Sequence, residues 1–201
     1  MGFLIMAVFT HGQYAPNNDA SFISVDGAES IDFLQSILTA NIETLPISDC
    51  RPAALLTPQG RILIDMMVYR HSETVIYLQT DKARCEDLFA RLKRYRLRRP
   101  VDLAILPDMK LYLWWKYDGT ILPNDSAIYL DPRHTDLGCR IITVDEDLPA
   151  AMSNTQLGNI CHWQARRIAQ AIPEGPIDLV PERALMLEAG LEKLGAVDFE
   201  K

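Results

Sequence analysis

The feature that most constrains the fold is residues 53–70, where two apolar runs flank a short polar turn. The turn is TPQG at residues 57–60, in which proline presets the backbone and glycine accepts a positive φ. This pattern predicts a β-hairpin. The second strand of the hairpin is hydrophobic at alternating positions on both of its faces, so we expect it to lie in the interior of a sheet.

One carboxylate, Asp65, stands in the middle of that second strand. A buried carboxylate without a partner costs on the order of several kcal/mol. Three kinds of partner remain open: an arginine such as Arg61 or Arg167, backbone N–H groups, or the N–H groups of a bound ligand.

The rest of the chain alternates between short apolar runs and segments of helical spacing. Strands are expected at residues 21–25, 74–79, 101–106, 110–115, 128–130 and 139–144. Helices are expected at residues 31–38, 85–92 and 156–171. The last helix is predicted to bury Leu157, Ile160, Trp163 and Ile168. The order of strand, helix, three strands, helix and strand indicates an α+β protein, with an antiparallel sheet covered on one side by helices.

Composition excludes some classes of partner. The net charge of −7 argues against nonspecific binding to nucleic acid or to an anionic membrane, since both favour a basic surface. The four cysteines are widely spaced without a CxxC pair, and the four histidines are scattered, so we predict no metal site. The apolar stretch at residues 1–9 is too short to span a bilayer, and we expect a ragged end or a small packed strand there.

A basic cluster at residues 91–99 contains six arginines and lysines in an otherwise acidic protein. It is typical of a solvated helix end, where cations are favoured by the helix dipole. It is also compatible with an anion site, for instance for the carboxylate tail of a ligand. Both interpretations remain open.

Several strings, taken together and in order, resemble the YgfZ branch of the glycine-cleavage T-protein (GcvT) family. They are FLQSILTANIETL from residue 33, AALLTPQGRILIDMMVYR from 53, LFARLKRYRLRRPVDL from 88, DPR from 131, WQARRIAQAIPEG from 163, LEAGL from 187 and VDFEK from 197. The resemblance covers roughly residues 21–201.

The resemblance implies a GcvT-like folate-binding fold with two related domains, each an antiparallel sheet with helices. We expect the first α+β domain to comprise residues 1–50 and 131–201, and the second to comprise residues 51–130. In the family a third, C-terminal barrel follows, and the branch's K-G-C-x-G-Q-E segment should begin at Lys201. Because the sequence stops at Lys201, we expect the barrel to be absent.

The function that the resemblance implies is assembly or repair of iron–sulfur clusters in client enzymes, with tetrahydrofolate or a related reduced folate bound. The alternatives are a T-protein-like, tetrahydrofolate-dependent aminomethyltransferase, or a truncated relative with little activity. Met186 stands where T-proteins carry an arginine, which counts against the enzyme. The resemblance also implies a cytoplasmic protein in a bacterium, or a mitochondrial matrix protein in a eukaryote.

The resemblance places Asp65 against the pterin ring, where it would also be the catalytic residue of an aminomethyltransferase. It implies further folate contacts from Asn41, Arg167, Glu188 and Lys201. At Asn41 the chain reads TAN where the YgfZ branch usually reads TND. Iron–sulfur client or assembly proteins are the partners that it implies besides folate.

Overall fold

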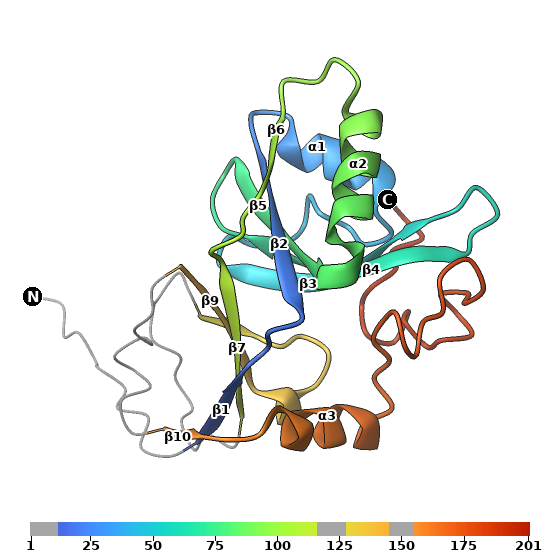
Figure 1. Cartoon of the computed structure of the whole chain (residues 1–201). Coiled ribbons are helices and arrows are strands. Elements are labelled where there is room, and N and C mark those ends of the chain that lie inside the picture. The colour runs from blue at the N-terminus through green and yellow to red at the C-terminus, as the bar shows by residue number, and fades with distance from the viewer. Residues whose placement is uncertain (1–11, 116–127, 145–154) are drawn as a thin grey trace, which may run out of the picture.

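The computed structural model describes residues 12–115, 128–144 and 155–201, which form two five-stranded sheets and three α-helices (Figure 1). The strands are β1 (Gln13–Pro16), β2 (Ala20–Asp26), β3 (Asp49–Leu56), β4 (Ile62–Arg70), β5 (Val75–Asp81), β6 (Asp102–Ile105), β7 (Lys110–Trp115), β8 (Ile128–Leu130), β9 (Cys139–Thr143) and β10 (Gln156–Leu157). The helices are α1 (Ser30–Ile37), α2 (Cys85–Arg96) and α3 (Ile160–Ala169), with short 3-10 turns at Lys82–Arg84 and Thr135–Leu137. The prediction for residues 1–9 lies outside the described residues.

The first sheet is antiparallel, in the order β3-β4-β5-β2-β6, and contains the predicted hairpin. The Thr57 N–H donates to the Arg61 carbonyl oxygen at 2.8 Å and closes the turn. β4 has a neighbour on both sides, which confirms that this strand is interior. Apolar side chains on both faces of β4 are buried, as their alternation predicts.

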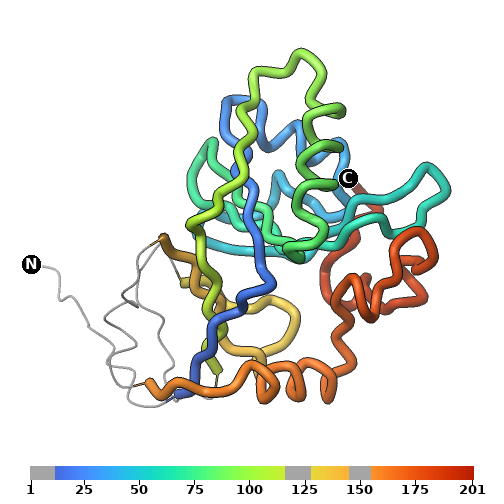
Figure 2. Tube along the Cα trace, in the orientation of Figure 1, coloured from blue at the N-terminus to red at the C-terminus, as the bar shows by residue number. Residues whose placement is uncertain are grey.

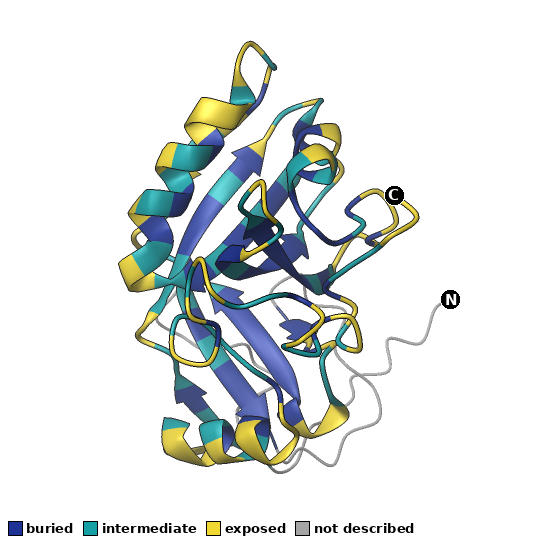
Figure 3. Ribbon diagram, turned by 90° about the vertical axis from the view of Figure 1, so that its right-hand side faces the viewer, coloured by how far each residue is buried: buried dark blue, intermediate teal, exposed yellow. Residues whose placement is uncertain are grey.

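Helices α1 and α2 cover one face of the first sheet (Figure 1). Phe33 and Leu34 of α1 and Leu88 and Leu92 of α2 are fully buried in one cluster with Val68 of β4. Leu88 and Leu92 lie four residues apart, and Phe33 and Leu34 follow the buried Ser30 by three and four residues, so one stripe of each helix faces the sheet. Figure 3 shows this division, with buried strands inside and exposed outer surfaces on the helices.

The second sheet has the order β10-β1-β7-β9-β8, and α3 packs beside it. The predicted helix at 156–171 begins only at Ile160, because residues 156–157 pair with β1 as β10. The predicted burial of Leu157 and Ile168 is wrong: they are 69% and 65% exposed. The buried stripe of α3 instead carries Trp163 and Arg167, which lie four residues apart on the same face.

Strand pairing runs across the predicted domain division. β2 falls within residues 1–50, yet it pairs along its length with β5, which falls within residues 51–130. β1 joins the second sheet, and the chain crosses from one sheet to the other between β1 and β2 (Figure 2). The division itself stays a prediction.

After α3 the chain runs through turns alongside the hairpin (Figure 1). The Ile62 N–H donates to the Ala184 carbonyl oxygen at 2.9 Å, and Leu179 and Leu191 are buried against Ala54 and Ile62. This C-terminal segment therefore forms a wall beside β4. No helix within the described residues is long and apolar enough to cross a membrane.

Candidate functional site

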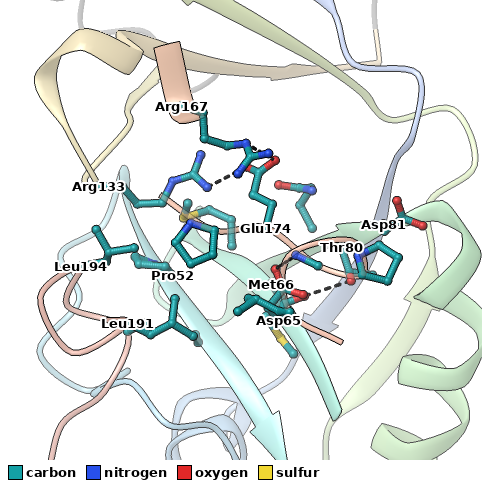
Figure 4. A pocket seen from close by; sticks show the side chains of 18 of the residues that line it. Pro52, Asp65, Met66, Thr80, Asp81, Arg133, Arg167, Glu174, Leu191 and Leu194 are labelled. Atoms are coloured by element: carbon teal, nitrogen blue, oxygen red, sulfur yellow. Dashed lines mark hydrogen bonds and ion pairs between the residues drawn. The ribbon is translucent and has the colours of Figure 1, made fainter. Parts of the chain in front are cut away.

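A cavity of about 200 Å³ lies where the first sheet, α3 and the C-terminal segment meet (Figure 4). Three parts of the chain that are remote in sequence line it. They contribute Asp65 and Met66 from β4, Arg133 and Arg167 from beside the second sheet, and Leu191 and Leu194 from the C-terminal segment. The cavity thus combines charged groups on one side with apolar side chains on the other.

Asp65 reaches the cavity from the middle of β4, opposite Ala54 on β3. Its Oδ2 accepts a hydrogen bond from the Gly175 N–H at 3.0 Å. The Thr80 hydroxyl donates to the Asp65 backbone oxygen at 3.0 Å and ties β4 to β5. Burial raises the pKa of Asp65, and the Gly175 N–H opposes that rise only in part.

The arginines expected as partners of Asp65 bind elsewhere. Arg61 donates to the Arg183 carbonyl oxygen at 2.8 Å. Arg167 donates to Asp178 Oδ2 at 2.7 Å and to Gln164 Oε1 at 2.7 Å. Neither arginine pairs with Asp65, and of the three kinds of partner left open by the sequence the structure shows a backbone N–H, that of Gly175.

Position 175 favours glycine because the backbone there comes very close to the Asp65 side chain. A Cβ atom at this position would lie 2.0 Å from Asp65 Oδ1, which is shorter than any tolerated contact. Only a residue without a side chain lets the backbone N–H come within hydrogen-bond distance of the carboxylate.

Beside Asp65 lies a network of buried ion pairs centred on Asp131. Arg133 donates to both Asp131 oxygens, at 2.9 and 2.7 Å, and Arg140 donates to Oδ2 at 2.9 Å. Burial opposes the charge on Asp131, but the two guanidinium groups outweigh it and hold the pKa of that carboxyl well below its usual range. Arg140 also donates to the Tyr69 hydroxyl and to Gln79 Oε1, both at 2.6 Å, which links the network to the first sheet.

Of the predicted folate contacts, the structure brings Asp65 and Arg167 to the cavity. Asn41 and Lys201 do not line it. The Asn41 amide donates to Asp198 Oδ2 at 2.9 Å, and the Lys201 ammonium donates to the Gln35 carbonyl oxygen at 2.8 Å, at the end of α1. These contacts belong to a second hollow, which Asp198 and Lys201 both line.

Glu188 is exposed on a turn and lines neither hollow. The basic cluster also lies away from the cavity, at the end of α2 opposite to Asp81, which lines the cavity. There Lys93 and Arg94 are exposed, as the interpretation of a solvated helix end requires. Within the described residues, no three His, Cys, Asp or Glu side chains are grouped so that they could hold a metal ion.

Sequence reasoning did not nominate Arg133, Glu174 or Gly175 as site residues. All three occur in strings that carried the resemblance, DPR and IPEG. A signal was therefore present, but nothing in the spacing indicated that these strings meet over Asp65.

Residues 17–109 match the family model described as the GCVT N-terminal domain, a span that includes β2–β6 and hence the whole first sheet. The fold is GcvT-like. The GcvT-like α+β fold expected from the sequence, with two sheets and helices, is thereby confirmed.

Curated relatives share the name of an iron–sulfur cluster assembly factor. The chain is 28% identical over 190 residues to the "iron-sulfur cluster assembly factor IBA57 homolog, mitochondrial" of Pyricularia oryzae, which covers 89% of this chain and 48% of the relative. It is 30% identical over 210 residues to the IBA57 factor of Homo sapiens, and this match covers 90% of this chain and 56% of the relative. The chain spans about half the length of the curated relatives it matches. A solved aminomethyltransferase T of the glycine cleavage system from Bartonella henselae aligns at 21% identity and a TM-score of 0.48, covering 53% of this chain and 29% of that one.

Proposed function

We propose that the cavity binds the pterin ring of tetrahydrofolate or a related reduced folate, and that the chain acts in the assembly or repair of iron–sulfur clusters in client proteins. The observation that carries the folate half is Asp65. Its carboxylate lines the cavity with a backbone N–H as its donor, and no Lys or Arg within the described residues forms an ion pair with it.

The chemistry of the lining suits a pterin. The aminopyrimidinone edge of a pterin carries neighbouring N–H groups, which a carboxylate accepts in pairs, as it does those of a guanidinium. Met66, Leu191 and Leu194 supply apolar contacts for the faces of a flat ring (Figure 4). A volume of about 200 Å³ is below the roughly 300–1,000 Å³ typical of drug-sized ligands, so it suits the bicyclic ring rather than a whole folate.

A reduced folate, when bound, supplies a nitrogen that accepts or carries a one-carbon unit. Asp65 would bind and orient the N–H groups of the ring. Thr80 holds the backbone of Asp65 in register, and the C-terminal segment covers the site on one side.

The iron–sulfur half of the proposal is supported by the relatives, whose names give that role and a mitochondrial location. We infer partners among iron–sulfur assembly or client proteins. By the same similarity we place the protein in mitochondria if its source is a eukaryote.

Titration with tetrahydrofolate tests the folate half, followed by tryptophan fluorescence and by the melting temperature. We expect saturable binding, and stabilisation of about 2.7 kcal/mol at a ligand concentration of roughly 100 times Kd. The control ligand is p-aminobenzoylglutamate, which has the tail of folate without the pterin and should not bind the cavity. Absence of any shift with tetrahydrofolate would overturn the proposal.

One observation favours a second candidate, a tetrahydrofolate-dependent aminomethyltransferase. Because burial raises the pKa of Asp65, this carboxyl is better suited to proton transfer near neutral pH than an ordinary aspartate. Transfer of a one-carbon unit from an aminomethyl-lipoyl carrier protein to tetrahydrofolate would establish the enzyme. Folate binding without transfer favours the assembly factor.

A further inference from the structure

Residues 173–176 (PEGP), here called the strap, connect α3 to the C-terminal segment and pass directly over Asp65. The strap is fixed at Glu174. Arg133 Nη1 donates to Glu174 Oε1 at 2.7 Å, and Arg167 Nε lies 3.5 Å from Oε2. The next residue, Gly175, makes the hydrogen bond to Asp65.

We propose that Glu174 is a positioning residue of the binding site: anchored by Arg133, it aims the Gly175 N–H at Asp65 Oδ2 and thereby fixes the carboxylate that faces the ligand. The nature of that ligand rests on the proposed function. The positioning of Asp65 is independent of it.

The anchor is rigid because Arg133 is itself held. Arg133 makes two parallel hydrogen bonds to Asp131, a side chain with no exposed surface, and its own side chain is only 6% exposed. Such bidentate pairs fix geometry as well as contributing energy. Glu174 therefore holds the strap at a fixed point, on the side of the cavity that is next to the second sheet.

Without that anchor, the strap would keep the hydrogen bonds between the Glu174 backbone and Asp178 but lose its side-chain tie, and two rotations would be less restrained. Glycine has the least restricted backbone of any residue, so the Gly175 N–H would no longer point one way. The carboxylate torsion of an aspartate is broad and roughly twofold, so Asp65 would turn as well. A ligand that pairs with both carboxylate oxygens needs them held in one plane.

Charge and position must be separated in the test, because several ionisable groups face Asp65. Glu174 on the strap raises the pKa of Asp65 and Arg133 lowers it, and both are secondary to burial. Arg167 of α3 and Asp81 of β5 line the same cavity. Glu174→Gln removes the negative charge but keeps an oxygen for Arg133, whereas Glu174→Ala removes both.

The readout is the amide proton of Gly175, followed by NMR as a function of pH in the absence of ligand. In the native chain we expect its chemical shift to follow the ionisation of Asp65. In Glu174→Gln the amide should still titrate, with a lower midpoint, because a negative charge near Asp65 has been removed. In Glu174→Ala most of the titration should disappear. Glu192→Ala, which removes an exposed carboxylate from the same C-terminal segment, is the matched control and should titrate as the native chain does.

Tetrahydrofolate affinity provides the second measurement. We expect Glu174→Ala to weaken binding about tenfold, the factor that one lost net hydrogen bond produces, with Glu174→Gln retaining most of the native affinity. Full titration of Gly175 in Glu174→Ala would overturn the positioning role. Loss of titration in Glu174→Gln as well would also overturn it, in favour of a pure charge effect. If the amide behaves as expected but none of the proteins binds tetrahydrofolate, the positioning role stands and the proposed ligand is wrong.

Discussion

Replacing Asp65 by asparagine should make the protein more stable at neutral to alkaline pH and weaken its binding of reduced folate. The substitution preserves shape and leaves an oxygen that can accept the Gly175 N–H. It removes the one property that is costly in the interior of β4, the negative charge. The two effects have opposite signs, so together they distinguish a functional carboxylate from a structural one.

The effect on stability follows from the raised pKa of Asp65. The folded state holds the Asp65 proton to a higher pH than the unfolded state does. The contribution of Asp65 to stability is therefore fully present below its unfolded pKa and is lost as pH rises through the folded pKa. For each unit by which folding raises the pKa of Asp65, the free energy of unfolding falls by about 1.4 kcal/mol once the pH is high enough to ionise Asp65 in both the folded and the unfolded state. Asparagine does not ionise, so the stability advantage of Asp65→Asn should grow with pH. The comparison is made between about pH 5, roughly one unit above the usual aspartate pKa, and about pH 8, well above it.

The effect on binding is the loss of a charge-assisted hydrogen bond to the ligand. Such a bond contributes roughly 1.5–3 kcal/mol, which corresponds to a Kd about 10–150 times higher. The amide nitrogen of asparagine would in addition present a donor to a ring edge that itself donates, so the upper half of that range is expected.

Urea denaturation at the two pH values and fluorescence titration with tetrahydrofolate measure both effects. Asp178→Asn is the control with the opposite sign. Arg167 and the Glu174 N–H outweigh the effect of burial and lower the pKa of Asp178, so this variant should lose stability at both pH values, and the loss should shrink only as pH falls below the usual aspartate range. A stability difference between Asp65→Asn and the native chain that does not change with pH would refute the burial argument. Unchanged affinity would remove Asp65 from the site.

Three further substitutions probe the surroundings of the cavity, each measured by urea denaturation. Gly175→Ala places a Cβ 2.0 Å from Asp65 Oδ1 and should cost about 1–3 kcal/mol, as overpacking does; native-like stability would show that the strap moves freely. Arg140→Met removes a buried cation from three partners and should cost about 3–5 kcal/mol; a loss no larger than that of the exposed-site control Arg98→Met would contradict this. Asp131→Asn should flatten the fall in stability in acid. The lowered pKa of Asp131 gives stability that is present above its unfolded pKa and is lost as pH falls through the folded pKa, so an acid limb as steep as the native one would refute this assignment.

The first sheet was predictable because its signals are local. Apolar alternation on both faces of β4 identified an interior strand, and TPQG identified the hairpin turn, without reference to any distant residue. The start of α3 was harder to predict. Gln156 and Leu157 have a pattern compatible with the first turn of a helix, and only the proximity of β1 makes them a strand. Tertiary pairing overrides local preference there.

The site was predictable only at the level of single residues. Asp65 could be identified from the sequence because it is a carboxylate in an apolar strand. The residue that contacts it, Gly175, is 110 positions later in the chain. Arg167 was identified as a site residue, and its acidic partner Asp178 was not. A side chain's type limits which partners it can take, whereas the choice among them depends on which loops the two sheets bring together.

The balance of charge around the cavity argues for the kind of ligand that it takes. Arg133, Arg140 and Arg167 each form an ion pair with a carboxylate of Asp131, Glu174 or Asp178. These arginines are therefore already paired, and Asp65, when ionised, adds a negative charge that none of them pairs with. A cavity of this kind repels a carboxylate tail and attracts a ring edge rich in N–H donors. The glutamate of a folate is then expected to contribute little here, and a reduced pterin without it should compete with tetrahydrofolate for the cavity, while p-aminobenzoylglutamate should not.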